Sequence, residues 1–192
     1  MATQKPLKFI HIAKNAGMSI EAIGKEHGLK WGGRDPDYKE TGKTRYSPHL
    51  IPSLLSPDYL AKNDFFIVVR NPYKRVLSQI LFTNRVYTAD HLNNCVKMLE
   101  HRIRPDGGIH TEQYKYAIPG VHIIHFENLE TEFNALMVQY GLPARLTKHI
   151  NKSSNLSNLS VKDFNADSIR LIQTLYKKDF ETFGYSLDVP QN

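Results

Sequence analysis

Three short apolar runs along the chain have the composition of β-strands. They span residues 7–12, 64–70 and 120–126 and are rich in β-branched and aromatic side chains. The run at 64–70 is continuous in the way that is typical of strands covered on both faces in a parallel sheet. We therefore expect these three segments to form the sheet of the protein.

Helical periodicity, with apolar side chains every three to four positions, appears after each of these strands. Asn71 and Pro72 are residue types favoured at the N-cap and at the first position of a helix. Strands that alternate with helices in this way predict an α/β fold with a parallel sheet and right-handed crossovers. The helices expected on this basis span residues 18–28, 49–62 with a proline break, 72–81, 128–141 and 161–183.

Length and composition fit an ordinary globular protein, and we expect one domain over residues 1–192. Hydrophobic residues make up 41% of the chain and charged residues 23%. No run is long enough to cross a membrane and residues 1–9 show no signal region, so we expect a cytosolic chain, although one that had lost an anchor would look the same. The single cysteine, Cys95, excludes an internal disulfide and is predicted to be a small core residue.

The net charge of +6 favours anionic ligands. No block of five or six basic residues occurs, so the charge does not indicate nucleic acid as a partner.

The first candidate anion site is the loop between the strand at 7–12 and the following helix. Gly17 and Ser19 place backbone N–H groups at a helix N-terminus, where anions bind, and Lys14 adds a positive charge. The Gly-Lys-Ser/Thr ending of a Walker A motif is missing, and with it the usual magnesium ligand of an NTPase. On spacing alone, a strand-to-helix turn with a glycine for close packing explains the pattern equally well.

The second candidate site follows the strand at 64–70. Arg70 stands at its carboxyl end, and Asn71, Arg75 and Ser78 share the helical face opposite the apolar one. Arg70 and Ser78 can therefore meet at one phosphate or sulfate, with the arginine binding through two N–H groups. The alternative is that Arg70 pairs with an acid across the sheet and Ser78 is a surface residue.

These two segments resemble the nucleotide-binding motifs of sulfotransferases. Residues 9–20 (FIHIAKNAGMSI) resemble the 5′-phosphosulfate loop HIPKTGGTS, and residues 66–82 (FIVVRNPYKRVLSQILF) resemble the 3′-phosphate motif FVRNPYDRLVSAY. Residues 121–133 are similar to FVGRFENLEEDF, and residues 175–185 to IYAEDFELFGY. The likeness, to the carbohydrate branch that includes Golgi and heparan-type enzymes, covers four segments in the right order along nearly the whole chain.

The resemblance implies transfer of a sulfonate from 3′-phosphoadenosine-5′-phosphosulfate (PAPS) to an acceptor hydroxyl or amine, leaving 3′,5′-ADP and requiring no metal. Together with the pattern it predicts a P-loop-like three-layer fold, a central parallel sheet flanked by helices. By position in the motifs, Lys14 neutralises the leaving phosphate and the amides of residues 15–19 hold the phosphosulfate. Arg70 and Ser78 hold the 3′-phosphate, and Lys152 lies where relatives close a lid. The donor-binding residues expected in this way are Lys14, Asn15, Ala16, Gly17, Met18, Ser19, Arg70, Ser78 and Lys152. The chain departs from the loop pattern at Ala13, Asn15, Ala16 and Met18, where the pattern has Pro, Thr, Gly and Thr.

In-line transfer also needs a base that removes the proton of the acceptor. His49 lies upstream of the Arg70 strand, where several relatives carry a catalytic histidine, and we take it as the expected base. His110 is the alternative on the acceptor side, whereas His11 is expected to be packed and hydrogen-bonded inside its strand. His122 and His125 are read as strand positions, with Glu127 at the strand's end as a residue that orients the site.

The acceptor is expected to be a carbohydrate or a small hydroxylated metabolite, contacted by residues 29–48 and 84–116. Two other classes stay open: a P-loop-like nucleotide kinase or NTPase, which magnesium dependence would favour, and a non-catalytic nucleotide- or glycan-binding module of the same fold.

Overall fold

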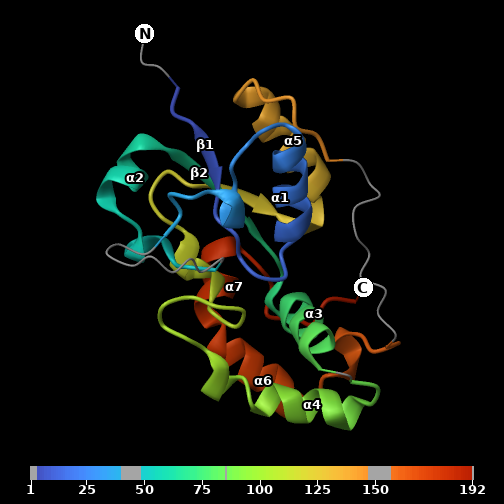
Figure 1. Cartoon of the computed structure of the whole chain (residues 1–192). Helices are drawn as coiled ribbons and strands as arrows, with labels where there is room; N and C mark the ends of the chain where they lie inside the picture. The colour runs from blue at the N-terminus through green and yellow to red at the C-terminus, as the bar shows by residue number, and fades with distance from the viewer. Residues whose placement is uncertain (1–3, 40–48, 85, 147–156, 192) are drawn as a thin grey trace.

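The protein is built around a three-stranded parallel sheet, seen here in a computed structural model that describes residues 4–39, 49–84, 86–146 and 157–191 (Figure 1). The strands are β1 (Leu7–Phe9), β2 (Asp64–Val69) and β3 (His122–His125), in the order β1-β2-β3. The three predicted strands are therefore present, and β2 pairs with both others. β1 ends earlier than expected, although the amide of Ile10 still donates to Phe66 O at 3.0 Å.

Both faces of the sheet are buried, which explains the continuous apolar run of β2. Phe66 and Val68 pack with helices α1 (Gly17–Glu26) and α5 (Leu129–Gln139). Phe65, Ile67 and Val69 point to the other face and pack with a second set of buried residues, which includes Tyr59 of α2 (Pro57–Lys62). Figure 1 shows α1 and α5 on one side of the sheet and α2 on the other. The expected sheet flanked by helices is confirmed to this extent.

A third apolar cluster lies among the remaining helices, α3 (Pro72–Thr83), α4 (Ala89–Lys97), α6 (Ala166–Leu175) and α7 (Lys177–Phe183). Figure 1 shows α3, α4 and α6 gathered at one end of the sheet. Cys95 belongs to this cluster and is 8% exposed, as predicted for a core residue, and burial raises the pKa of its thiol. The predicted cap is also confirmed, because Asn71 Oδ1 accepts from the amides of Tyr73 (3.1 Å) and Lys74 (3.3 Å).

The single helix predicted over residues 161–183 is wrong. The chain forms a 3₁₀ turn, η6 (Val161–Asp163), and then α6 and α7 as separate helices. Asn165 interrupts the first part because its side chain caps α6 by accepting from the amide of Ser168 at 2.9 Å. Tyr176 separates α6 from α7, and its hydroxyl donates to His110 O at 3.0 Å.

The break expected in residues 49–62 is present. A 3₁₀ turn, η2 (Pro52–Leu54), is followed by α2, which Ser56 caps and Pro57 begins. The other short turns are η1 (Gly32–Arg34), η3 (Glu100–Arg102), η4 (Gln113–Tyr116) and η5 (Phe126–Asn128). Within the described parts of the chain, no helix has the length and apolar character needed to cross a bilayer.

Candidate functional site

The backbone between β1 and α1 adopts an uncommon conformation. Lys14 and Ala16 both have positive φ angles, 68° and 62°, which non-glycine residues rarely adopt. Left-handed residues in a tight turn direct successive N–H groups to one side and form an anion-binding concavity. The Ser19 amide closes the turn by donating to Ala16 O at 3.0 Å. The backbone amides of residues 15–18 donate to no acceptor among the described residues.

Ala16 is under backbone strain, and glycine should relieve it. A left-handed conformation costs a residue with a Cβ about 1–2 kcal/mol. Glycine avoids this cost, but its greater freedom in the unfolded chain offsets about 0.5–1 kcal/mol of the gain in stability. We expect Ala16→Gly to raise the free energy of unfolding by about 0.5–1 kcal/mol in urea denaturation. Ala22→Gly, at an exposed position of α1, is the control and should lower it by about 1 kcal/mol. Equal losses in both variants would contradict the left-handed assignment.

Gly17 is required by close packing against His11. A Cβ at Gly17 would lie 2.0 Å from His11 Nε2. His11 is 8% exposed, and its Nδ1 pairs with Glu21 Oε1 at 2.7 Å. Burial opposes ionisation of Glu21, but hydrogen bonds from His11 and from the Gly33 amide outweigh it, and the pKa of Glu21 is lowered. The prediction of a packed, hydrogen-bonded His11 is confirmed, and the glycine of the loop serves this packing.

A buried amide network ties the loop to the carboxyl end of β2. Asn15 is fully buried, and its Nδ2 donates to Val68 O (2.7 Å) and to Gln113 Oε1 (2.6 Å). Gln113 also accepts from the Arg70 amide (2.9 Å) and donates through Nε2 to Arg70 O (2.9 Å). Asp179 of α7 accepts from the amides of Gln113 (3.0 Å) and Tyr114 (2.9 Å). The Asn15 side chain thus fixes the loop through Nδ2, and the backbone amide of Asn15 has no acceptor among the described residues.

Arg70 joins the two predicted anion sites. Its Nη1 donates to Lys14 O at 3.1 Å, and its guanidinium lies over the Phe126 ring, 4.1 Å from the centroid. Its Nε is buried and has no partner among the described residues. Burial lowers the pKa of Arg70, while Glu127 favours its charge. Glu127 itself accepts from the Asn71 amide (3.0 Å) and the Tyr185 hydroxyl (2.9 Å), so it orients this corner of the sheet.

Lys14 extends from the loop toward the end of α3. Its Nζ lies 3.7 Å from the centroid of the Phe82 ring, whose side chain is 70% exposed. Burial lowers the pKa of Lys14, and the positive charge of Arg70 lowers it further. Two cations therefore face the same region, which an anionic ligand would stabilise.

Arg75 does not lie on the polar side of α3 where the sequence pattern placed it. The residue is buried, with 3% of its surface exposed. Its guanidinium donates to three backbone carbonyls, those of Ala13 (3.1 Å), Ile109 (3.3 Å) and Thr111 (2.9 Å). Ser78, one turn further along α3, is half-buried. Arg75 thus clamps the loop to the 109–111 segment, and it is a third cation beside the loop.

His49 lies next to His11, at the end of β1. Their rings meet edge to face with centroids 4.7 Å apart, and His49 Nδ1 is 3.2 Å from His11 O. Because a carbonyl oxygen only accepts, Nδ1 carries the proton and Nε2 has the free lone pair. Burial lowers the pKa of His49 to about 4, and the positive charge of Arg75 acts in the same direction. His49 is therefore neutral at pH 7.

The backbone around His49 is also held firmly. Its carbonyl accepts from the Gly108 amide (3.2 Å) and the Tyr116 hydroxyl (2.7 Å). A Cβ at Gly107 would lie 2.1 Å from the same oxygen. This contact fixes the position of His49 relative to the loop.

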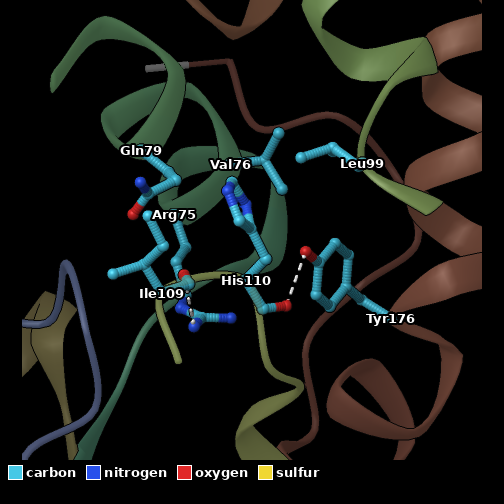
Figure 2. Close-up of a pocket in the computed structure, with 7 residues that line it drawn as sticks. All are labelled: Arg75, Val76, Gln79, Leu99, Ile109, His110 and Tyr176. Carbon is cyan, nitrogen blue, oxygen red and sulfur yellow. Dashed lines mark hydrogen bonds between the residues drawn. The ribbon is translucent and has the colours of Figure 1, made fainter. Parts of the chain in front are cut away.

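The other histidines occupy different surroundings. His110 is 7% exposed and lines a small gap beneath α3, and burial lowers its pKa to about 4 (Figure 2). His122 and His125 lie in β3 as predicted. His122 Nε2 is 2.8 Å from the hydroxyl of Tyr140, at the far end of the sheet from the loop.

The structure brings most of the predicted donor-binding residues together. Lys14, residues 15–19 and Arg70 form one region at the carboxyl ends of β1 and β2. Met18 is 71% exposed at the start of α1, and Ser19 is buried. Lys152 lies outside the described residues. Among the residues that are described, no group of three or more His, Cys, Asp or Glu side chains is arranged to hold a metal ion.

Sequence reasoning missed Gln113 and Asp179, which fix the site from behind. Both are fully buried and lie 66 residues apart in the chain, and most of their contacts are to backbone groups. A glutamine in the polar segment around 113 carries no periodic or motif signal that separates it from a surface residue.

Comparison with known proteins does not assign the chain to a family. No protein-family model matches the chain, and no curated protein matches it.

Proposed function

We propose that the protein is a PAPS-dependent sulfotransferase that moves a sulfonate to a hydroxyl of a carbohydrate or small hydroxylated metabolite. The observation that carries this proposal is the contact of Arg70 with the carbonyl of Lys14. It unites a cation at the end of β2 with a loop at the end of β1 whose amides have no acceptor among the described residues. A ligand that carries phosphate groups at two positions of one ribose suits such a combined site.

The donor fits the residues of this region. The amides of residues 15–18 would hold the 5′-phosphosulfate at the N-terminus of α1, a place that favours anions. The guanidinium of Arg70, whose Nε has no partner among the described residues, would bind the 3′-phosphate together with Ser78. Bound donor would supply an activated sulfonate. Lys14 would offset the charge that develops on the leaving phosphate.

His49 is the proposed base. As the acceptor oxygen forms its bond to sulfur and the bond from sulfur to the phosphate oxygen breaks, the acceptor proton would pass to Nε2 of His49. The hydrogen bond of Nδ1 to His11 O keeps this lone pair available. The low pKa keeps the imidazole neutral, and a bound anionic donor would raise its basicity.

The donor site can be tested with the product nucleotide. We expect 3′,5′-ADP to raise the melting temperature without magnesium because it binds the folded state, and ATP to do so much less. Arg70→Ala should remain folded and lose about 1.5–3 kcal/mol of affinity for 3′,5′-ADP in calorimetric titration. Arg70→Lys should recover only part, since an ammonium cannot reproduce the two N–H groups of the guanidinium.

Lys74→Ala is the matched control, because this half-buried cation lies four residues after Arg70, in the first turn of α3, without a role in the proposed site. Equal shifts with ATP and 3′,5′-ADP, or a strict need for magnesium, would favour a kinase or NTPase instead. A second experiment incubates the protein with labelled PAPS and a library of acceptors and detects sulfonate addition by mass spectrometry. Nucleotide binding without sulfonate addition to any acceptor would favour a binding module.

A further inference from the structure

Glu21 of α1 holds two other segments of the chain through one oxygen atom. Its Oε1 accepts from His11 Nδ1 at 2.7 Å and from the Gly33 amide at 2.9 Å. The side chain is 14% exposed, and a carboxylate withdrawn from water to this extent is costly unless it is hydrogen-bonded. The proposed reaction so far assigns no role to this carboxylate, although its partner His11 lies beside the proposed base.

Two glycines leave the space that the Glu21–His11 pair occupies. A Cβ at Gly32 would lie 2.2 Å from Glu21 Oε1, and Gly32 has a positive φ angle of 51°. A Cβ at Gly17 would lie 2.0 Å from His11 Nε2. The His11 ring also stacks on the ring of Phe9, with 5.8 Å between the centroids. The carboxylate, Gly17 and Phe9 together fix the orientation of the His11 ring.

His11 in turn supports His49. The carbonyl oxygen of His11 lies 3.2 Å from His49 Nδ1, and the two rings meet edge to face at 87°. The pKa of Glu21 is lowered, so its carboxylate is ionised at pH 7 and only accepts. Nδ1 of His11 therefore carries a proton, as Nδ1 of His49 does. Because the hydrogen bonds of a histidine ring set its tautomer, the carboxylate fixes the His11 ring, and this ring packs against His49.

We propose that Glu21 is a positioning residue for His49. By holding His11 in place, it keeps the His49 imidazole in one orientation, with the proton on Nδ1 and the lone pair on Nε2. The bond to the Gly33 amide ties the same unit to the segment after α1, which is expected to contact the acceptor. That His49 acts as the base rests on the proposed function. The contribution of Glu21 is an acceptor atom at a fixed place, and not its negative charge.

Two variants separate the position of this acceptor atom from its charge. Glu21→Gln keeps an acceptor oxygen at the same reach and loses the charge. Glu21→Asp keeps the charge and draws the carboxylate back by one methylene. Glu26→Asp, at an exposed position of α1, is the matched control. Circular dichroism shows whether each variant is folded.

The first readout is the tautomer of His49 at pH 7. It is read from the ¹⁵N shifts of the ring in long-range ¹⁵N–¹H spectra, in which His49 is assigned by the loss of its signals in His49→Ala. We expect one protonated and one unprotonated nitrogen in the wild type, Glu21→Gln and Glu26→Asp. In Glu21→Asp the two shifts should move toward each other, because the loosened ring populates both tautomers.

The second readout is turnover with labelled PAPS. Glu21→Asp should lower kcat by about 10- to 100-fold, since a small misplacement of a catalytic group costs this much. Its affinity for 3′,5′-ADP should stay near the wild-type value, because Glu21 is not among the proposed donor-binding residues. Glu21→Gln should retain much more of the turnover than Glu21→Asp, and Glu26→Asp should match the wild type.

Unchanged His49 shifts in Glu21→Asp overturn the proposal, because a residue that only stabilised the turn at Gly32 and Gly33 would give that result. An equal loss of turnover in Glu21→Gln and Glu21→Asp also overturns it, since the charge would then matter and not the position. The failure of the proposed function gives a different result. The His49 shifts would still change in Glu21→Asp alone, while 3′,5′-ADP leaves the melting temperature unchanged and no acceptor gains a sulfonate.

Discussion

His49→Ala is expected to lower kcat by about 10²- to 10⁴-fold, the usual contribution of a general base. The affinity for 3′,5′-ADP should change little, because the imidazole would face the acceptor and not the phosphates. The measurement is turnover with labelled PAPS and the best acceptor found in the library, together with calorimetric titration of 3′,5′-ADP. Lys14→Ala should differ by weakening both turnover and nucleotide binding, since its charge meets the donor before and during the reaction.

The pH profile provides a second readout of the same role. A base must be unprotonated, and the pKa of His49 is lowered from 6.5 to about 4. The acidic limb of kcat/KM, which reports the free enzyme, should therefore lie near pH 4, with activity retained as the pH falls through 6.5. Circular dichroism over the same range shows whether the protein stays folded.

The control for His49 is His27→Ala, an exposed histidine at the end of α1, which should leave turnover unchanged. Normal turnover by His49→Ala together with an inactive His110→Ala would place the base in the gap beneath α3. The assignment of His49 as the base would then be wrong.

Gln113→Met is expected to lower the free energy of unfolding by about 3–5 kcal/mol. The substitution removes the bonds of the amide to Asn15 and to both backbone groups of Arg70. Each buried group that loses its partner costs about 1–3 kcal/mol. Urea denaturation measures the effect, and Gln139→Met should change stability by less than about 0.5 kcal/mol.

Gln79→Met should act in the opposite direction, because both amide atoms of this α3 side chain are buried without a partner among the described residues. Both side chains are buried, but only the amide of Gln113 is hydrogen-bonded. A loss of under about 1 kcal/mol in Gln113→Met would mean that the network does not hold the loop and β2 together.

Local pattern was sufficient for the elements that carry a strong signal. The run at 64–70 predicted β2, and Asn71 and Pro72 predicted the start of α3, because strand burial and helix capping depend on residues adjacent in sequence. The same pattern missed the break at Tyr176, since the hydroxyl of that residue is bonded to His110, 66 positions away. It also placed Arg75 on the wrong side of α3, because a long side chain can turn inward to carbonyls that only the fold supplies.

By itself, the sequence determined the three strands, the helices α1, α3 and α5 that follow them, the two loops at the ends of β1 and β2, and the charges that they carry. It could not determine that Arg70 donates to the carbonyl of Lys14, or that a side chain at Gly17 would clash with His11. Nor could it show that buried Gln113 and Asp179 are hydrogen-bonded to each other and hold the loop in place. These contacts join residues from 6 to 66 positions apart. Local propensity acts over a few residues, whereas hydrogen bonds between buried groups are set by which segments the core brings together, and only the tertiary structure decides that.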